Sequence, residues 1–189
     1  VFKNLSYSLV GQFALIIISF ISMAVLGRLL EPGIFGIFAL LLAVHALLIP
    51  LVDFGLTPAY LKIEKISQET KNVFFTLNIS LGVLYGFLFL GISFFFEQDG
   101  FIRYAFAFIF SGLLFSYNQQ SIANLMREHQ QKRLMYINVS SSFFAVLLAI
   151  LLGYLGFGLY ALLSQQLAIQ IVRTLVLRMI YPQNYKITN

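Results

Sequence analysis

Six apolar runs follow one another along this chain, and each is long enough to cross a lipid bilayer as a helix. A transmembrane helix needs about 20 mostly apolar residues, and only short charged, Gly- or Pro-containing breaks separate the runs. The expected spans are Leu9–Gly27, Phe35–Gly55, Val73–Phe96, Phe101–Asn124, Leu134–Gly153 and Leu159–Ile180. The sequence therefore predicts an all-α integral membrane protein, with residues 1–189 forming one six-helix bundle.

The composition supports lipid as the solvent of this chain. Of the 189 residues, 60% are hydrophobic and only 10% are charged, whereas a soluble globular domain has about 25% charged residues. So few charges cannot cover a surface that faces water. We therefore expect the lipid bilayer to surround the helices.

Lysine and arginine are unevenly divided between the two ends of the expected helices. Cytoplasmic loops of membrane proteins carry an excess of these residues. If the N-terminus is cytoplasmic, the outer loops hold only Arg28 and Arg103. The cytoplasmic segments then hold the other ten basic residues: Lys3, Lys62, Lys65, Lys71, Arg127, Lys132, Arg133, Arg173, Arg178 and Lys186. The sequence thus predicts a multi-pass membrane protein with both termini in the cytoplasm. The net charge of +5 reflects this asymmetry, and we expect no nucleic-acid partner.

Several kinds of site are not indicated. The chain has no cysteine, which excludes a thiolate nucleophile and a Cys-based metal site. His45 and His129 are too far apart in sequence to read as a pair of metal ligands. A glycine-rich phosphate loop, a Ser/His/Asp set and a pair of catalytic carboxylates are all missing. We expect no enzymatic activity, no metal and no cofactor.

Polar side chains inside the expected spans point to a cavity. Such side chains are costly in hydrocarbon and usually face a bundle interior or a water-filled space. Six of them fall in the cytoplasmic half of the membrane: Gln12, Asp53, Asn78, Gln120, Asn138 and Gln170. The outer halves are almost free of amides, so we expect a cavity open to the cytoplasm and closed by apolar packing outside. The alternative is that these amides hold the helices together.

Two of the spans carry a polar face. In the last span Gln166, Gln170 and Arg173 are spaced four and three residues apart, which places them on one side of a helix. The same argument applies to a set in the first span: Ser8, Gln12, Ser19 and Ser22. Both helices are therefore expected to turn a polar side toward the bundle interior.

Asp53 is the one acidic residue within an expected span, and two structures are possible around it. If the second helix continues unbroken to Tyr60, Asp53 lies about 10 Å inside the membrane boundary and needs a polar partner. Alternatively Gly55 ends the helix, Thr57 caps a short interfacial helix and Pro58 opens it, which places Asp53 at the cavity mouth. The Gly-x-Thr-Pro pattern favours the second structure. In either case Asp53 is the best candidate for a coupling or substrate-contacting carboxylate.

The segment LGRLLEPGIFGIFALLLAVHALLIPLVDFGLTPAYLK resembles the start of polysaccharide flippases of the Wzx/WzxC type. These belong to the multidrug/oligosaccharidyl-lipid/polysaccharide (MOP) exporter superfamily. In that family the first hairpin commonly reads Arg-Leu-Leu-x-Pro-x-x-(Phe/Tyr)-Gly, and the second span ends in Asp-(Phe/Leu)-Gly-Leu. Here these motifs are residues 28–36 and residues 53–56. The segments LMREHQQKRL and LGFGLYALLSQQLAIQIVRTLVL also resemble the family.

The resemblance implies an architecture, a partner and a substrate. Such flippases are built from two lobes related as parallel repeats, and this chain resembles the N-terminal lobe. The implied partner is then a C-terminal lobe or a second copy of the chain. The implied function is export of an oligosaccharide linked to undecaprenyl diphosphate across the bacterial cytoplasmic (inner) membrane, by alternating access.

In this family cationic residues of the cavity meet the diphosphate of the lipid. Arg28 and Arg173 are the cations nearest to the spans here. An interfacial anchor is the favoured role of Arg28, whereas Arg173 equally suits a snorkelling side chain. The other substrate or coupling candidates are Asp53, Gln12, Asn78, Gln120, Gln166 and Gln170. Two alternative functions stay open: a multidrug or small-solute antiporter of the same superfamily, and a half-size transporter that works as a homodimer.

Overall fold

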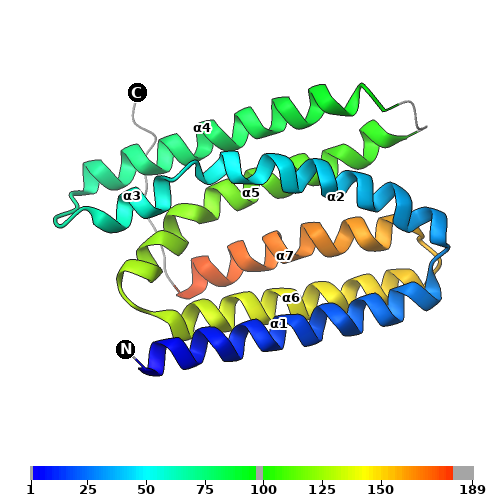
Figure 1. The fold of residues 1–189 in the computed structure, drawn as a ribbon, viewed down its shortest axis with the longest axis horizontal. Coiled ribbons are helices and arrows are strands. Elements are labelled where there is room, and N and C mark those ends of the chain that lie inside the picture. The colour runs from blue at the N-terminus through cyan, green and yellow to red at the C-terminus, as the bar shows by residue number, and fades with distance from the viewer. Residues whose placement is uncertain (1, 97–99, 181–189) are drawn as a thin grey trace.

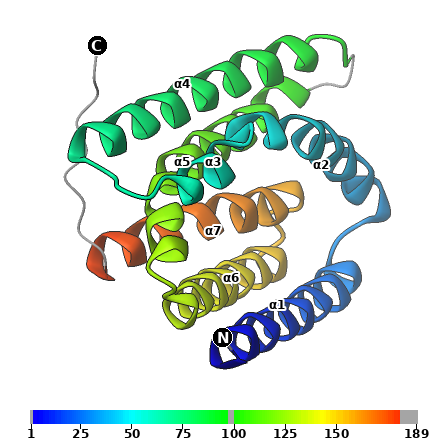
Figure 2. The same ribbon diagram turned by 60° about the vertical axis from the view of Figure 1, so that its left-hand side comes forward.

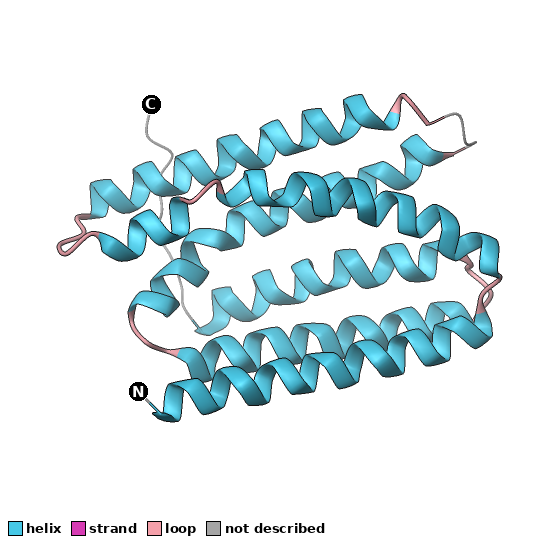
Figure 3. Ribbon diagram, in the orientation of Figure 1, coloured by secondary structure: helices cyan, strands magenta, loops and turns pink. Residues whose placement is uncertain are grey.

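The computed structural model describes residues 2–96 and 100–180, and within these ranges every regular element is a helix (Figure 3). The elements are α1 (Phe2–Leu29), α2 (Pro32–Asp53), α3 (Leu56–Lys62), α4 (Gln68–Ser93), α5 (Phe101–Arg127), α6 (Gln131–Tyr154) and α7 (Leu159–Ile180). Six of these helical segments are long and apolar enough to cross a membrane, α2 and α3 counting as one. The all-α fold with six spans is therefore confirmed.

Most helices extend beyond the apolar runs that marked them in the sequence. Helix α4 begins at Gln68, because the hydroxyl of Ser67 accepts a hydrogen bond from the Thr70 N–H at 3.1 Å and caps the helix. Helix α5 continues to Arg127, past the last apolar residues of its run. Apolar runs mark the part of a helix that faces hydrocarbon, whereas caps mark where the helix ends. The boundaries differ for this reason.

The long helices run side by side along the bundle, alternating in direction (Figure 1). We call the end of the bundle at which α1 begins the proximal end. The opposite end, where a turn joins α1 to α2, is the distal end. Helix α6 packs between α1 and α7, α4 packs along α5, and α5 contacts α7 to join the two groups. Helix α2 lies against α4 and α5. Helices α1 and α2 therefore diverge onto opposite sides of α7 (Figure 2).

Glycines let α4 and α5 approach closely. A Cβ atom on Gly82 would lie 2.3 Å from Ser116 Oγ, and one on Gly112 would lie 2.1 Å from Tyr85 Cε1. Small residues at such positions allow the van der Waals packing that joins helices in lipid. The buried Tyr85 and Phe89 fill the space beside this contact and form the centre of the larger core cluster.

The helix is interrupted between α2 and α3, as in the second of the two structures expected around Asp53. Phe54 and Gly55 adopt left-handed conformations with φ of 38° and 77°, and the Phe54 N–H bonds the Pro50 carbonyl at 3.0 Å. The expectation that Thr57 caps the following helix is wrong in one respect. The capping oxygen belongs to Asp53, which accepts from the Thr57 N–H at 3.1 Å.

Candidate functional site

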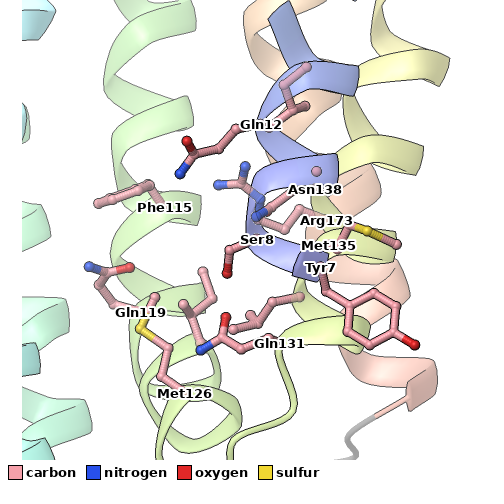
Figure 4. Close-up of a pocket in the computed structure, with 14 residues that line it drawn as sticks. Tyr7, Ser8, Gln12, Phe115, Gln119, Met126, Gln131, Met135, Asn138 and Arg173 are labelled. Carbon is pink, nitrogen blue, oxygen red and sulfur yellow. The ribbon is translucent and has the colours of Figure 1, made fainter. Parts of the chain in front are cut away.

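A pocket of about 410 Å³ opens at the proximal end, between α1, α5, α6 and α7 (Figure 4). We call it the proximal pocket. Its polar lining comes from four helices: Ser8 and Gln12 of α1, Gln119 of α5, Gln131 and Asn138 of α6, and Arg173 of α7. The remaining lining residues are mainly apolar, with Tyr7 at one edge. None of the described residues that line this pocket is acidic. The pocket thus combines one cation with amides and hydroxyls.

Arg173 extends from α7 into the space between α1 and α5 (Figure 4). Its Nη1 donates to Gln170 Oε1 at 3.4 Å, and its buried Nε has no hydrogen-bond partner among the described residues. A guanidinium presents five N–H donors in a fixed fork that matches carboxylate and phosphate oxygens. Arg173 therefore lines the pocket with one of its donors, the Nε N–H, unpaired among the described residues.

Gln119 connects the proximal pocket to Asp53. The Oδ1 atom of Asp53 accepts from Gln119 Nε2 at 3.4 Å and from Thr57 Oγ1 at 2.5 Å, in addition to the Thr57 N–H. Asp53 itself does not line the pocket. The carboxylate therefore lies behind Gln119, between the break in α2 and the wall of the pocket.

Helix α3 is fixed to α5 at the same end of the bundle. Tyr60 donates its hydroxyl hydrogen to Asn124 Oδ1. Arg127 donates to three backbone carbonyls at the end of α3, those of Tyr60 at 3.3 Å, Ile63 at 2.5 Å and Glu64 at 2.8 Å. These bonds satisfy helix-terminal carbonyls that otherwise lack partners. They hold the region around Asp53 against α5.

A second pocket, of about 390 Å³, lies at the distal end between α1, α2 and α7. Its lining is mostly apolar, and two of its polar groups pair with each other, since Ser22 Oγ donates to Gln165 Oε1 at 3.1 Å. Apolar residues were expected to close the distal half by packing. They line a hollow instead, because α1 and α2 diverge. The proximal pocket is nevertheless the more polar of the two, as expected from the position of the amide residues in the spans.

His45 and Gln166 form a separate polar cluster within the bundle. His45 Nδ1 lies 2.7 Å from the Tyr85 hydroxyl, which donates to the Phe108 carbonyl at 3.3 Å. His45 Nε2 lies 3.4 Å from the Gln166 amide nitrogen. The consistent arrangement is a neutral ring with its proton on Nδ1, because the amide nitrogen can only donate. Gln166 therefore joins α7 to α2 and does not line the proximal pocket.

The remaining candidate residues occupy different places. Gln12 and Arg173 line the proximal pocket, and the buried Gln170 contacts it through Arg173. Asn78 and Gln120 are buried at 3% and 1% exposure and lie outside the pocket lining. Arg28 is exposed in the last turn of α1, at the distal end. The structure therefore brings one of the two candidate cations into the pocket.

The sequence analysis did not single out two amide residues of the lining, Gln119 and Gln131, and only Gln119 had a usable signal. On α5 Phe115, Gln119, Ile122 and Met126 repeat at spacings of four, three and four, which is one helical face, and all four line the pocket. That pattern singles out Gln119 rather than its neighbour Gln120. Gln131 lies in a charged segment between two spans, where no helical pattern of apolar residues indicates which way its side chain points.

A family model described as "Polysaccharide biosynthesis protein" matches residues 25–189. A Klebsiella pneumoniae protein described as "Uncharacterized membrane protein in cps region" is 30% identical over 81 residues. That alignment covers 43% of this chain and 17% of the relative, so the chain matches only a small part of that protein. No solved structure matches the chain. With six helices long and apolar enough to span a membrane in the part of the chain that the structure describes, this multi-pass membrane protein belongs to the polysaccharide biosynthesis protein family.

Proposed function

We propose that this protein carries a lipid-linked oligosaccharide across the membrane by alternating access, and that the proximal pocket receives the diphosphate of the lipid carrier. The observation that carries the proposal is Arg173, whose guanidinium reaches the pocket with Nε unpaired and no acidic side chain among the described lining residues. The membership of the chain in a polysaccharide biosynthesis family supports the substrate class.

A charge beside a membrane-embedded cavity is costly and marks a substrate or ion path in most membrane proteins. Arg173 lies seven residues, about two helical turns, from the end of α7. Its single bond to Gln170 is long, at 3.4 Å. An anionic group in the pocket supplies the partner that the described residues lack.

The uncharged lining suits a saccharide. Amides and hydroxyls from α1, α5 and α6 surround the guanidinium: Ser8, Gln12, Gln119, Gln131 and Asn138. Such groups both donate and accept hydrogen bonds, as the hydroxyls of a sugar require. An exporter of organic cations needs acidic or aromatic groups at its site. The described lining offers the aromatic rings of Tyr7 and Phe115 but no carboxylate, and its one charged side chain is the cation Arg173.

The test is a leaflet assay with the intact protein in liposomes. The probe is a fluorescent prenyl-diphosphate-linked disaccharide, and an impermeant quencher measures how fast it changes leaflet. Arg173→Leu should slow the transfer about 10- to 100-fold, since hydrogen bonds to a charged group contribute about 1.5 to 3 kcal/mol. Arg173→Lys should retain part of the rate, because it keeps the charge and loses the fork.

Arg178→Leu is the matched control. Arg178 lies on the same helix, is exposed and donates to the Tyr117 hydroxyl at 3.0 Å, outside the pocket. Its substitution should leave the transfer rate within about twofold, because exposed polar contacts contribute little. If Arg173→Leu transfers the probe as fast as Arg178→Leu, the assignment of the diphosphate to the pocket is refuted. Transport of organic cations in place of the probe would favour a drug exporter.

We further propose that the proximal end faces the cytoplasm, where the lipid-linked substrate is loaded. The basic residues support this orientation: the connections and the adjoining helix ends at the proximal end carry Lys62, Lys65, Lys71, Arg127, Lys132, Arg133 and Arg178. Transport requires a second set of helices opposite α1 and α2, supplied by another lobe or another copy. Crosslinking in native membranes distinguishes these two sources.

A further inference from the structure

We propose that Asp53 is a positioning residue: it orients the amide of Gln119 so that Gln119 Oε1 accepts a hydrogen bond from a sugar hydroxyl next to the diphosphate. This inference rests on the proposed function, because it takes the diphosphate to lie at Arg173. It assigns to Asp53 a role other than carrying a coupling proton.

The hydrogen bonds of Asp53 fix which end of the Gln119 amide faces it. The Oδ1 atom of Asp53 is the acceptor in each of its three hydrogen bonds, and of the two ends of a glutamine amide only the nitrogen donates. Gln119 must therefore turn Nε2 toward Asp53, at 3.4 Å. The opposite end of the amide, Oε1, is then left for the pocket. Figure 4 shows this arrangement, with the Gln119 oxygen turned toward the side on which Ser8 lies and the nitrogen turned away.

The carboxylate is itself held in place by α3. Its Oδ1 accepts from the Thr57 N–H at 3.1 Å and from Thr57 Oγ1 at 2.5 Å. The left-handed turn at Phe54 and Gly55 brings α3 back beside the end of α2. Asp53 is therefore anchored from one side by Thr57 and reaches Gln119 on the other.

The result is a pocket with two different walls. Arg173 on α7 offers only donors, and Gln119 on α5 offers an acceptor across the space between α1 and α5 (Figure 4). A diphosphate complements the donors, and a hydroxyl group complements the acceptor. The pair therefore selects a ligand in which an anion and a hydroxyl are neighbours, as in a sugar diphosphate.

The positioning role and a proton-coupling role differ in what Asp53→Asn does. An asparagine can place its carbonyl oxygen where Asp53 Oδ1 lies and accept the same three hydrogen bonds. We expect Asp53→Asn to bind and transport within about twofold of the unchanged protein, because only the charge on one acceptor is lost. A coupling carboxylate, by contrast, cannot be replaced by an amide that does not titrate.

The experiment compares two probes on the intact protein in nanodiscs. One is a short-chain prenyl diphosphate, and the other is the same lipid carrying N-acetylglucosamine. Asp53→Ala and Gln119→Leu should each weaken binding of the sugar-bearing probe about five- to tenfold, the contribution of one hydrogen bond. Both should leave binding of the bare diphosphate unchanged, whereas Arg173→Leu should weaken both probes.

The double variant Asp53→Ala/Gln119→Leu should bind the sugar-bearing probe no more weakly than either single variant, because both act on one hydrogen bond. Thr57→Val removes the hydroxyl bond to Asp53 and keeps the bond from the Thr57 N–H and the contact with Gln119. It should therefore weaken binding of the sugar-bearing probe less than Asp53→Ala does. Additive effects of Asp53→Ala and Gln119→Leu would overturn the proposal, as would loss of transport in Asp53→Asn.

The outcomes separate this inference from the function on which it rests. If Arg173→Leu has no effect on either probe, the diphosphate site is wrong and the proposed function fails with it. If Arg173→Leu weakens both probes while Gln119→Leu changes neither, the diphosphate site stands and the role of Asp53 and Gln119 is refuted.

Discussion

Gly112→Ala is predicted to destabilise the bundle more than the addition of one methyl group implies. A Cβ atom at Gly112 would lie 2.1 Å from Tyr85 Cε1, 2.5 Å from Cδ1 and 2.8 Å from Cζ. An ordinary contact needs at least 3.4 Å, so the tyrosine ring must retreat by more than 1 Å. The ring has no free space, because Tyr85 is fully buried with Phe89 and Phe108 packed beside it.

The magnitude follows from the contacts that the retreat disturbs. Overpacking a core costs about 1 to 3 kcal/mol. Displacing the Tyr85 hydroxyl weakens its bonds to His45 and to the Phe108 carbonyl, which contribute about 1 kcal/mol each. Alanine stabilises a helix by up to about 1 kcal/mol relative to glycine, which offsets part of this loss. The net loss is about 2 to 4 kcal/mol.

Unfolding of the purified protein in mixed micelles, with SDS as the denaturant and circular dichroism as the signal, measures this loss. Gly91→Ala is the matched control, because a Cβ atom on Gly91 of α4 meets nothing within 4 Å. In the Gly112→Ala background, Tyr85→Leu should cost less than it does alone, since the clash is already relieved. Equal stability of Gly112→Ala and Gly91→Ala would refute the argument.

Two further predictions concern the proximal end. Arg127→Ala should lower the free energy of unfolding by about 1 to 2 kcal/mol and speed hydrogen exchange in residues 60–67, because three carbonyls lose their donor. Arg127→Lys should recover little of this stability. Unchanged hydrogen exchange in Arg127→Ala would contradict the assignment. For the orientation, the chain has no native cysteine, so an impermeant maleimide should label Glu31→Cys on intact cells and Lys65→Cys only after permeabilisation. The reverse pattern would place the proximal end outside.

The number and class of the elements were predictable because lipid imposes a simple constraint. Every backbone polar group in hydrocarbon needs an internal partner, so an apolar run of sufficient length is a helix whatever its neighbours are. The last span illustrates this, since Leu159–Ile180 was expected and α7 has the same bounds. Which helices pack against each other was harder to predict from the sequence. The contact of α1 with α6, for example, joins segments far apart in sequence and leaves no periodic signal.

The candidate site was predictable only in part, for a related reason. Depth in the membrane can be read from the sequence, and it correctly grouped Gln12 and Asn138, which both line the proximal pocket. Rotation about the helix axis cannot be read from depth. Asn78 therefore shared the expected depth while lying buried against α5, where its backbone carbonyl accepts from Ser116 Oγ at 2.8 Å. The role of Asp53 depended on a turn between two helices, which fixes its direction toward Thr57 and Gln119.

The packing of α1 on α6 also sets an order of events during synthesis. Helix α1 leaves the ribosome before α6, its main partner, which begins at Gln131, about 100 residues after α1 ends. At about 5 to 20 residues per second, roughly 5 to 20 s pass before α6 is made. During that interval α1 has only lipid around its apolar surface, which carries large exposed side chains such as Phe13 and Phe20. Helix α1, which enters the membrane before the other described helices, is thus among the last of them to find its place in the bundle, and the proximal pocket cannot exist until it does.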